Sequence, residues 1–277
     1  MSAYDAWIDR TEEQEDMAAA APLAGLAALL DHETSPWRAG EVPPLGHWLS
    51  FLPRARQSDI DVDGHPRRGG FLPPIELPRR MWAGGRLQFH GAIPVGAPIL
   101  RRSTIAAVAP KTGASGEMVF VTVRHEVLAG GRVAVTEEQD LVYRDAPKGP
   151  APPEGPPPEP RPADATRTVV PDPVMLFRFS ALTFNSHRIH YDRDYAREEE
   201  GYPGLVVHGP LLATLLMDHA LTSRPGANVA RFEFRAQRPL FDTASFQLCL
   251  KDRDGGFDLW AQDAAGRVAT SAKVELA

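Results

Sequence analysis

Imidazole side chains occur twice within a short span of the second half of the chain. The first stretch is polar and reads Asn185-Ser186-His187-Arg188-Ile189-His190-Tyr191-Asp192. The second, Val207-His208-Gly209-Pro210, opens an apolar run that predicts a buried helix from about Pro210 to Leu221. An imidazole can move a proton near neutral pH, and the free N–H groups of a helix N-terminus stabilise a developing negative charge. Together they suit acid–base chemistry on a carbonyl compound.

His190 is the first candidate for the proton-transferring group, although a single histidine is more often structural. Asn185 can hold a water molecule or a substrate oxygen without titrating, and Gly209 can offer a backbone N–H. In an extended stretch His187 shares a face with Asn185. His208 either lines the site or caps the helix.

A metal site has weaker support. His187, His190 and Asp192 can in principle gather a divalent ion, but Asp192 is better explained as a solvated or capping residue, and the sequence has no H-E-x-x-H motif. We therefore expect no metal. The sequence also lacks the G-x-S-x-G, G-x-G-x-x-G and P-loop motifs, which disfavours serine hydrolases, dinucleotide enzymes and NTPases.

The overall composition indicates a globular protein. The chain has 277 residues, 43% of them hydrophobic, and no apolar run long enough to span a bilayer. Its formal charge of −6 argues against nucleic acid as a partner. The single cysteine, Cys249, lies in an apolar strand and excludes an intrachain disulfide. The acidic N-terminus does not resemble a targeting signal, so we expect a cytoplasmic protein without a membrane partner.

A proline-rich segment divides the chain. Ala146 to Pro162 reads APKGPAPPEGPPPEPRP, which forms neither helix nor central strand and predicts a semi-rigid spacer rather than a ligand for SH3-type domains. The expected organisation is an N-terminal domain over residues 1–145, a linker over 146–166 and a C-terminal domain over 167–277.

Both halves end in a predicted antiparallel meander, which indicates an α+β fold with each sheet wrapped round a helix. Pro43 to Leu52 is a candidate short helix in the first half, and Asp16 to His32 a candidate outer helix. The expected strands are 87–93, 103–110, 118–127 and 134–143 in the first half, and 168–170, 229–236, 245–251, 257–262 and 268–275 in the second.

The segment from Asp63 to Gly85 is rich in proline and glycine, and we expect it to be irregular and functional. It carries four arginines and a tryptophan: Arg67, Arg68, Arg79, Arg80 and Trp82. The arginines fit recognition of a carboxylate or phosphate, or they are ordinary surface charges.

These motifs resemble a known family. Asn185 to His190 followed by Val207-His208-Gly209 is similar to the signature D-x-N-P-[IL]-H followed by A-H-G of the MaoC-like (R)-specific enoyl-CoA hydratases, except that Asn185 replaces the aspartate. The stretch FNSHRIHYD resembles the double hot-dog type 2 hydroxyacyl-thioester dehydratases. The Asp63 to Gly85 segment resembles bacterial 3-methylfumaryl-CoA (mesaconyl-CoA) hydratases.

The resemblance implies a double hot-dog fold and a hydro-lyase acting on an α,β-unsaturated acyl-CoA, with coenzyme A carried by the substrate and no separate cofactor. His190, Asn185 and Gly209 would be catalytic, and the substrate would contact His208, His187, Arg188 and the residues of the arginine-bearing segment. A homodimer is expected. A fatty-acid 3-hydroxyacyl-thioester dehydratase, an itaconyl-CoA hydratase, a thioesterase and a non-catalytic acyl-CoA-binding module remain open alternatives.

Overall fold

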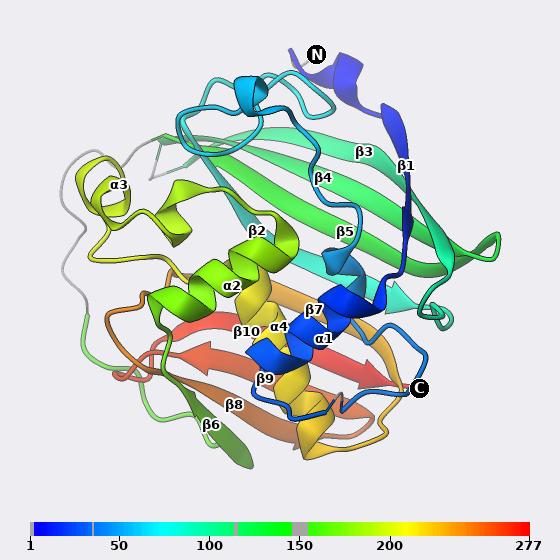
Figure 1. Ribbon diagram of the computed structural model, residues 1–277. Helices are drawn as coiled ribbons and strands as arrows, with labels where there is room; N and C mark the ends of the chain where they lie inside the picture. Colours follow the sequence, from blue (N-terminus) through cyan, green and yellow to red (C-terminus); the bar gives the residue numbers. More distant parts are fainter. Residues whose placement is uncertain (1–2, 35, 114–115, 146–154) are drawn as a thin grey trace.

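The computed structural model describes residues 3–34, 36–113, 116–145 and 155–277. Within these ranges the strands form one ten-stranded antiparallel sheet in the order β1-β3-β4-β5-β2-β7-β10-β9-β8-β6 (Figure 1). The strands are β1 (Thr11–Met17), β2 (Arg79–Phe89), β3 (Pro98–Gly113), β4 (Gly116–Ala129), β5 (Arg132–Arg144), β6 (Ala165–Val169), β7 (Val229–Ala236), β8 (Phe246–Arg253), β9 (Gly256–Gln262) and β10 (Val268–Leu276).

The two halves of the chain meet where β2 pairs with β7. The contact is close, because a Cβ atom on Gly84 would lie 2.5 Å from the carbonyl oxygen of Phe234, and one on Gly85 would lie 2.9 Å from the Phe234 ring. These two glycines therefore allow the backbones to approach rather than breaking the strand. The expectation that the segment is irregular as far as Gly85 is wrong, since β2 begins at Arg79.

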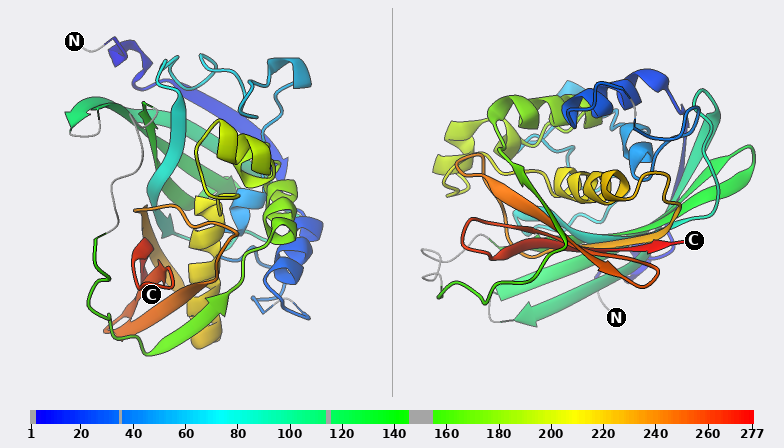
Figure 2. Two further views of the ribbon diagram at one scale, coloured as in Figure 1. Left: turned by 90° about the vertical axis from the view of Figure 1, so that its left-hand side faces the viewer. Right: turned by 90° about the horizontal axis from the view of Figure 1, so that it is seen from below.

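Helix α4 (Gly209–Ser223) lies on the concave face of the second half and packs on β8, β9 and β10. Ten consecutive residues, 211–220, are buried, as expected for a helix enclosed by a sheet. Figure 2 shows α4 between the sheet and an outer pair of helices, α1 (Ala20–Leu29) and α2 (Pro173–Thr183), which contact each other. Asp172 caps α2 by accepting a hydrogen bond from the Met175 N–H at 2.7 Å.

The first half has a different interior. The candidate short helix over Pro43 to Leu52 is a four-residue 3₁₀ helix, η2 (Gly46–Leu49), and a second 3₁₀ turn, η3 (Gln57–Asp59), follows. Consequently no long helix lies against β3, β4 and β5 in the described residues.

The α+β prediction is confirmed, and the strand predictions of the second half agree with the structure to within a few residues. Residues 146–154 of the expected linker lie outside the described residues, and its last two residues, Ala165 and Thr166, belong to β6. Cys249 is buried, as expected.

Candidate active site

The polar stretch starts where α2 ends. Phe184 adopts a left-handed conformation with φ 48°, which turns the chain out of the helix. The stretch then forms the 3₁₀ turn η4 (Arg188–His190) and leads into α3 (Arg193–Glu198), which Asp192 caps through the Tyr195 N–H at 3.0 Å. This path brings the ring of His190 to the start of α4, where it stacks on His208 with a centroid separation of 3.6 Å.

His190 has the properties of a neutral proton acceptor. Its Nδ1 lies 2.7 Å from the carbonyl oxygen of Val206, and because a carbonyl can only accept, Nδ1 carries the proton and Nε2 keeps a lone pair. The side chain is only 7% exposed. Burial lowers the pKa of His190 to about 4, with the Val206 hydrogen bond opposing this shift.

His208 occupies the N-cap position of α4, but its side chain does not bond the helix. Its Nε2 lies 2.9 Å from the Ser180 hydroxyl, and burial holds the pKa of His208 well below its usual value. The His208 ring is therefore neutral and packs against the ring of His190. Gly209 is the first residue of α4, and its N–H belongs to the first turn, which has no acceptor within the helix.

The side chain of Asn185 offers a hydrogen-bond donor to the site. Its side-chain oxygen accepts the His187 backbone N–H at 3.0 Å, and its own backbone N–H bonds the Ser180 carbonyl at 2.9 Å. The amide NH₂ group remains available, so Asn185 can bind the oxygen of a water molecule but cannot take its proton.

A cavity of about 830 Å³ opens beside these residues and is lined from both halves of the chain. Of the predicted residues, Asn185, Arg67, Arg68, Arg80 and Trp82 line it. The rings of His187, His190 and His208 and the backbone of Gly209 do not, although their sequence neighbours Ser186 and Pro210 do. His187, His190 and His208 therefore lie next to the cavity, at the start of α4.

The predicted arginines separate into different roles. Arg79 pairs with Glu200 at 2.9 Å and Arg188 with Asp192 at 2.7 Å, and neither lines the cavity, so their contact with a substrate stays a prediction. Arg68 lines it but donates to the carbonyl groups of Ile75, Leu77 and Pro78.

Arg80 differs from these arginines. It is half-buried and lines the cavity, and its guanidinium makes no hydrogen bond or ion pair with the described part of the chain. Its positive charge adds to burial in lowering the pKa of both His65 and His187, which places the charge near the histidine cluster.

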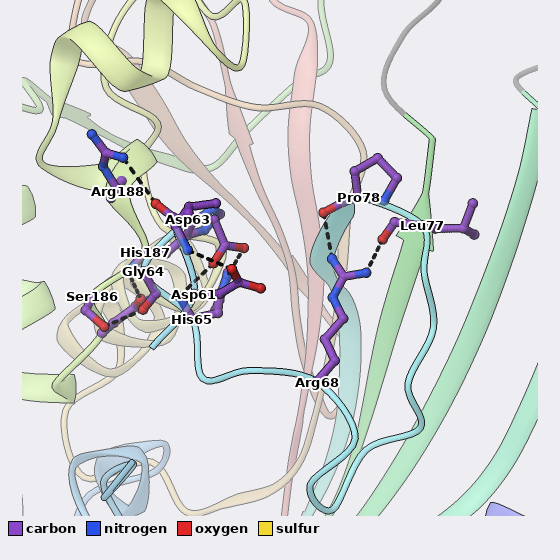
Figure 3. A network of polar contacts seen from close by, with 12 residues as sticks. Asp61, Asp63, Gly64, His65, Arg68, Leu77, Pro78, Ser186, His187 and Arg188 are labelled. Carbon is purple, nitrogen blue, oxygen red and sulfur yellow. Dashed lines mark hydrogen bonds and ion pairs between the residues drawn. The ribbon is translucent and has the colours of Figure 1, made fainter. Parts of the chain in front are cut away.

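Asp63 and His65, from the first half of the chain, lie beside the histidines of the second half, and neither was predicted as a site residue from the sequence. Nδ1 of His65 lies 2.9 Å from a carboxylate oxygen of Asp63 (Figure 3). The His65 ring is 4.1 Å from that of His187, whose ring is 5.4 Å from that of His190. The segment was expected to be functional for its arginines, while the alternation Asp63-Gly64-His65 was the overlooked signal.

Asp63, His65 and His187 also form a possible metal-ligand cluster, with ligand atoms within 4.8 Å of one another. It differs from the His187, His190 and Asp192 set considered from the sequence, because Asp192 instead bonds Arg188 and caps α3. Both carboxylate oxygens of Asp63 accept hydrogen bonds from His65, one from Nδ1 at 2.9 Å and one from the backbone N–H at 2.8 Å, so the described residues form a hydrogen-bonded pair and an ion would have to bind His65 through Nε2.

The first half contributes its own buried polar network to the cavity. His47 lies 2.9 Å from Glu137, and the indole N–H of Trp48 donates to the same carboxylate at 3.0 Å. Burial opposes ionisation of Glu137, but the hydrogen bond and charge of His47, together with His125 and Gln139, outweigh it and lower the pKa of Glu137 to about 2. His125, 2.9 Å from Ser103, has its pKa lowered to about 4 by burial. The cavity beside Asn185 therefore extends to this network of the first half.

Comparison with known proteins identifies the class. The family model of hydroxyacyl-thioester dehydratase type 2 matches residues 45–242, and the chain belongs to this family. A mesaconyl-C(4)-CoA hydratase of Chloroflexus aurantiacus is 51% identical over 282 positions, covering 100% of this chain and 99% of its own.

Solved structures confirm the double hot-dog fold. HtdX of Mycobacterium tuberculosis matches with a TM-score of 0.70 at 20% identity, covering 97% of this chain and 100% of its own. A second protein of that organism, described as having a double hot-dog fold, matches with a TM-score of 0.57 at 13% identity, covering 97% and 96%. Among the helices that the structure describes, none has the length and apolar character to cross a membrane.

Proposed function

We propose that the chain is an enoyl-CoA hydratase that adds water to mesaconyl-C4-CoA, and that coenzyme A enters only as part of the substrate. The observation that carries this proposal is the neutral, buried imidazole of His190 stacked at the start of α4, beside a cavity large enough for a thioester substrate. The 51% identical relative with the same activity in its name supports the choice of substrate.

Hydration of an α,β-unsaturated thioester requires a base for water and a site for the negative charge that develops on the thioester oxygen. Nε2 of His190 takes the water proton while Asn185 holds the water oxygen. The N–H groups of the first turn of α4, starting at Gly209, hold the thioester oxygen; removing such a donor typically costs about a hundred- to a thousandfold in rate.

The dicarboxylic substrate fits the position of Arg80. The β-carbon of the mesaconyl-C4 group carries a methyl group and a carboxylate, so the carboxylate must be held next to the reacting carbon. Arg80 lines the cavity close to the histidine cluster and has no carboxylate partner of its own within the described residues. A planar guanidinium can bind such a carboxylate through two hydrogen bonds.

The test is turnover of the His190→Ala variant with mesaconyl-C4-CoA, followed by ultraviolet loss of the conjugated double bond. We expect kcat to fall roughly a hundred- to ten-thousandfold, the usual contribution of a general acid–base group. His90→Ala is the matched control, because His90 is exposed just after β2 and its side chain bonds Thr136 at 2.9 Å, away from the histidine cluster. Near-normal turnover of the His190 variant would refute the assignment.

Dehydration of a 3-hydroxyacyl thioester is the second candidate, favoured by the family description. It is the reverse of the same chemistry and needs the same residues. A panel of short, long and dicarboxylic enoyl-CoA esters separates the two candidates, because a long-chain preference would favour fatty-acid dehydration. Release of free coenzyme A thiol would indicate thioester hydrolysis instead.

A further inference from the structure

The loop that carries Asp63 and His65 is docked on the polar stretch. The Arg188 backbone N–H donates to the Asp63 carbonyl at 2.9 Å, the Arg188 guanidinium to the Val62 carbonyl at 3.1 Å, and the Ser186 hydroxyl to the Gly64 carbonyl (Figure 3). Gly64 has φ +90°, and a Cβ atom there would lie 1.8 Å from the Ser186 carbonyl oxygen. The two segments are therefore in backbone contact, which fixes His65 beside the predicted site.

The pairing of His65 with Asp63 defines its tautomer. A carboxylate can only accept, so Nδ1 of His65 carries the proton and Nε2 is free for the cavity, which His65 lines. The Asp63 carboxylate also stabilises the imidazolium form. His187 and His190 have no carboxylate within hydrogen-bond reach in the described residues. Of the three clustered rings, His65 is therefore the one that most readily holds an extra proton.

The pair of His65 and Asp63 could supply a proton-transferring group that the motif around Asn185 lacks. Where the family signature has a titrating aspartate, Asn185 can donate a hydrogen bond but cannot transfer a proton. His190 can accept the water proton, yet hydration also requires a proton at the α-carbon. A second proton-transferring group on the cavity side would supply it.

We propose that His65 is a second catalytic residue, the general acid that protonates the α-carbon, and that Asp63 is its positioning residue. The inference rests on the proposed hydratase function. As the water oxygen bonds to the β-carbon, its proton goes to Nε2 of His190 and the π electrons move into the enolate of the thioester. The α-carbon then takes the proton from Nε2 of the His65 imidazolium. His190 afterwards loses its proton to solvent and His65 regains one, so the cycle closes.

Several charges act on His65. Asp63 from its own loop favours the imidazolium, while burial, Arg68 from the same loop and Arg80 from β2 disfavour it. His187 lies against the ring, and the charge of Asp63 also acts on Tyr195 of α3, contributing to the raised pKa of that phenol. Because these effects together lower the pKa of His65, the acid form is lost as pH rises through a pKa below 6.5, and the hydration rate should fall on that side.

The experiment measures kcat and kcat/KM against pH for hydration by the full-length protein and three variants. In His65→Gln we expect kcat to fall roughly a hundred- to ten-thousandfold and the alkaline limb to disappear. In Asp63→Asn the limb should move to lower pH by about one unit or more, because the imidazolium loses its negative partner. Asp61→Asn is the control: Asp61 is exposed, and its carboxylate accepts the Val62 backbone N–H, so the limb should stay in place.

Three results would overturn the inference. One is wild-type turnover in His65→Gln, and another is an alkaline limb that Asp63→Asn leaves unmoved while only the melting temperature drops. The third is about one tightly bound divalent ion per purified chain whose removal abolishes turnover, since Asp63 and His65 would then serve the ion. Failure of the proposed hydratase function can be told apart from failure of the His65 inference, because in the former case the unmodified protein hydrates none of the esters.

Discussion

Gly64 offers a sharp test of how the two halves build one site. In Gly64→Ala the new Cβ would meet the Ser186 carbonyl oxygen at 1.8 Å and the Arg188 nitrogen at 3.2 Å, both backbone atoms. The loop must therefore retreat by about an ångström or more, which lengthens the 2.9 Å bond between Arg188 and Asp63 beyond the hydrogen-bond limit of about 3.5 Å. Three loop-to-stretch hydrogen bonds are weakened together, at a cost of about 1 kcal/mol each.

Gly69→Ala is the matched control. Gly69 lies in the same loop with φ +86°, so an alanine there suffers a similar backbone strain, but its Cβ would approach only the Pro74 side chain, at 3.7 Å. The difference between the two variants therefore isolates the docking contact and amounts to about 3 kcal/mol of local opening. Misplacing a proton-transferring group by about 1 Å should also lower kcat about a hundredfold in Gly64→Ala.

The assay is amide hydrogen exchange of the peptides around residues 60–68 and 186–190, combined with hydration kinetics. We expect exchange of the Arg188 amide to be about a hundredfold faster in Gly64→Ala than in Gly69→Ala, as about 3 kcal/mol requires. Equal protection and equal kcat in the two variants would show that the loop does not need its close approach.

Two further outcomes are expected. Arg80→Gln should raise KM for mesaconyl-C4-CoA about tenfold or more while leaving that for crotonyl-CoA unchanged, because only the former has a carboxylate to bind, and Arg79→Gln should not discriminate between the esters. The free energy of unfolding should fall as pH drops from 6.5 towards 4. His190 and His125 are neutral in the folded protein and take up protons on unfolding, which lowers the free energy of unfolding by roughly 3 kcal/mol for each histidine by pH 4. His125→Gln should flatten that slope, and an unchanged slope would contradict the argument.

Local patterns made much of the fold predictable. The strand over residues 229–236 agrees with β7 because alternating burial and flanking turns are encoded within the segment itself. The helix start at Gly209-Pro210 was similarly readable from its own residues. His190 could be chosen because the motif and the helix start are close in the sequence.

The rest depended on contacts between distant segments. The position of His65 follows from a loop that docks on residues more than 120 positions away, and no local pattern encodes that docking. For the same reason Gly84 and Gly85 read as strand breakers until β7 was seen to lie against them. Arg79 and Arg80 are adjacent in sequence and equivalent in type, but only the fold separates an ion pair from a cavity-lining charge.

The short η2 turn, standing where the second half has the long α4, has a consequence for how such enzymes can diverge. Because no long helix fills the first half of the sheet in the described residues, space remains there as part of the cavity. Four residues of the first half line it: His47, Trp48, His125 and Glu137. Residues there can be exchanged to suit a new acyl group without disturbing the imidazole and amide groups at the start of α4. The first half is thereby a place where a changed side chain would alter the acyl group that fits, while the groups at the start of α4 stay as they are.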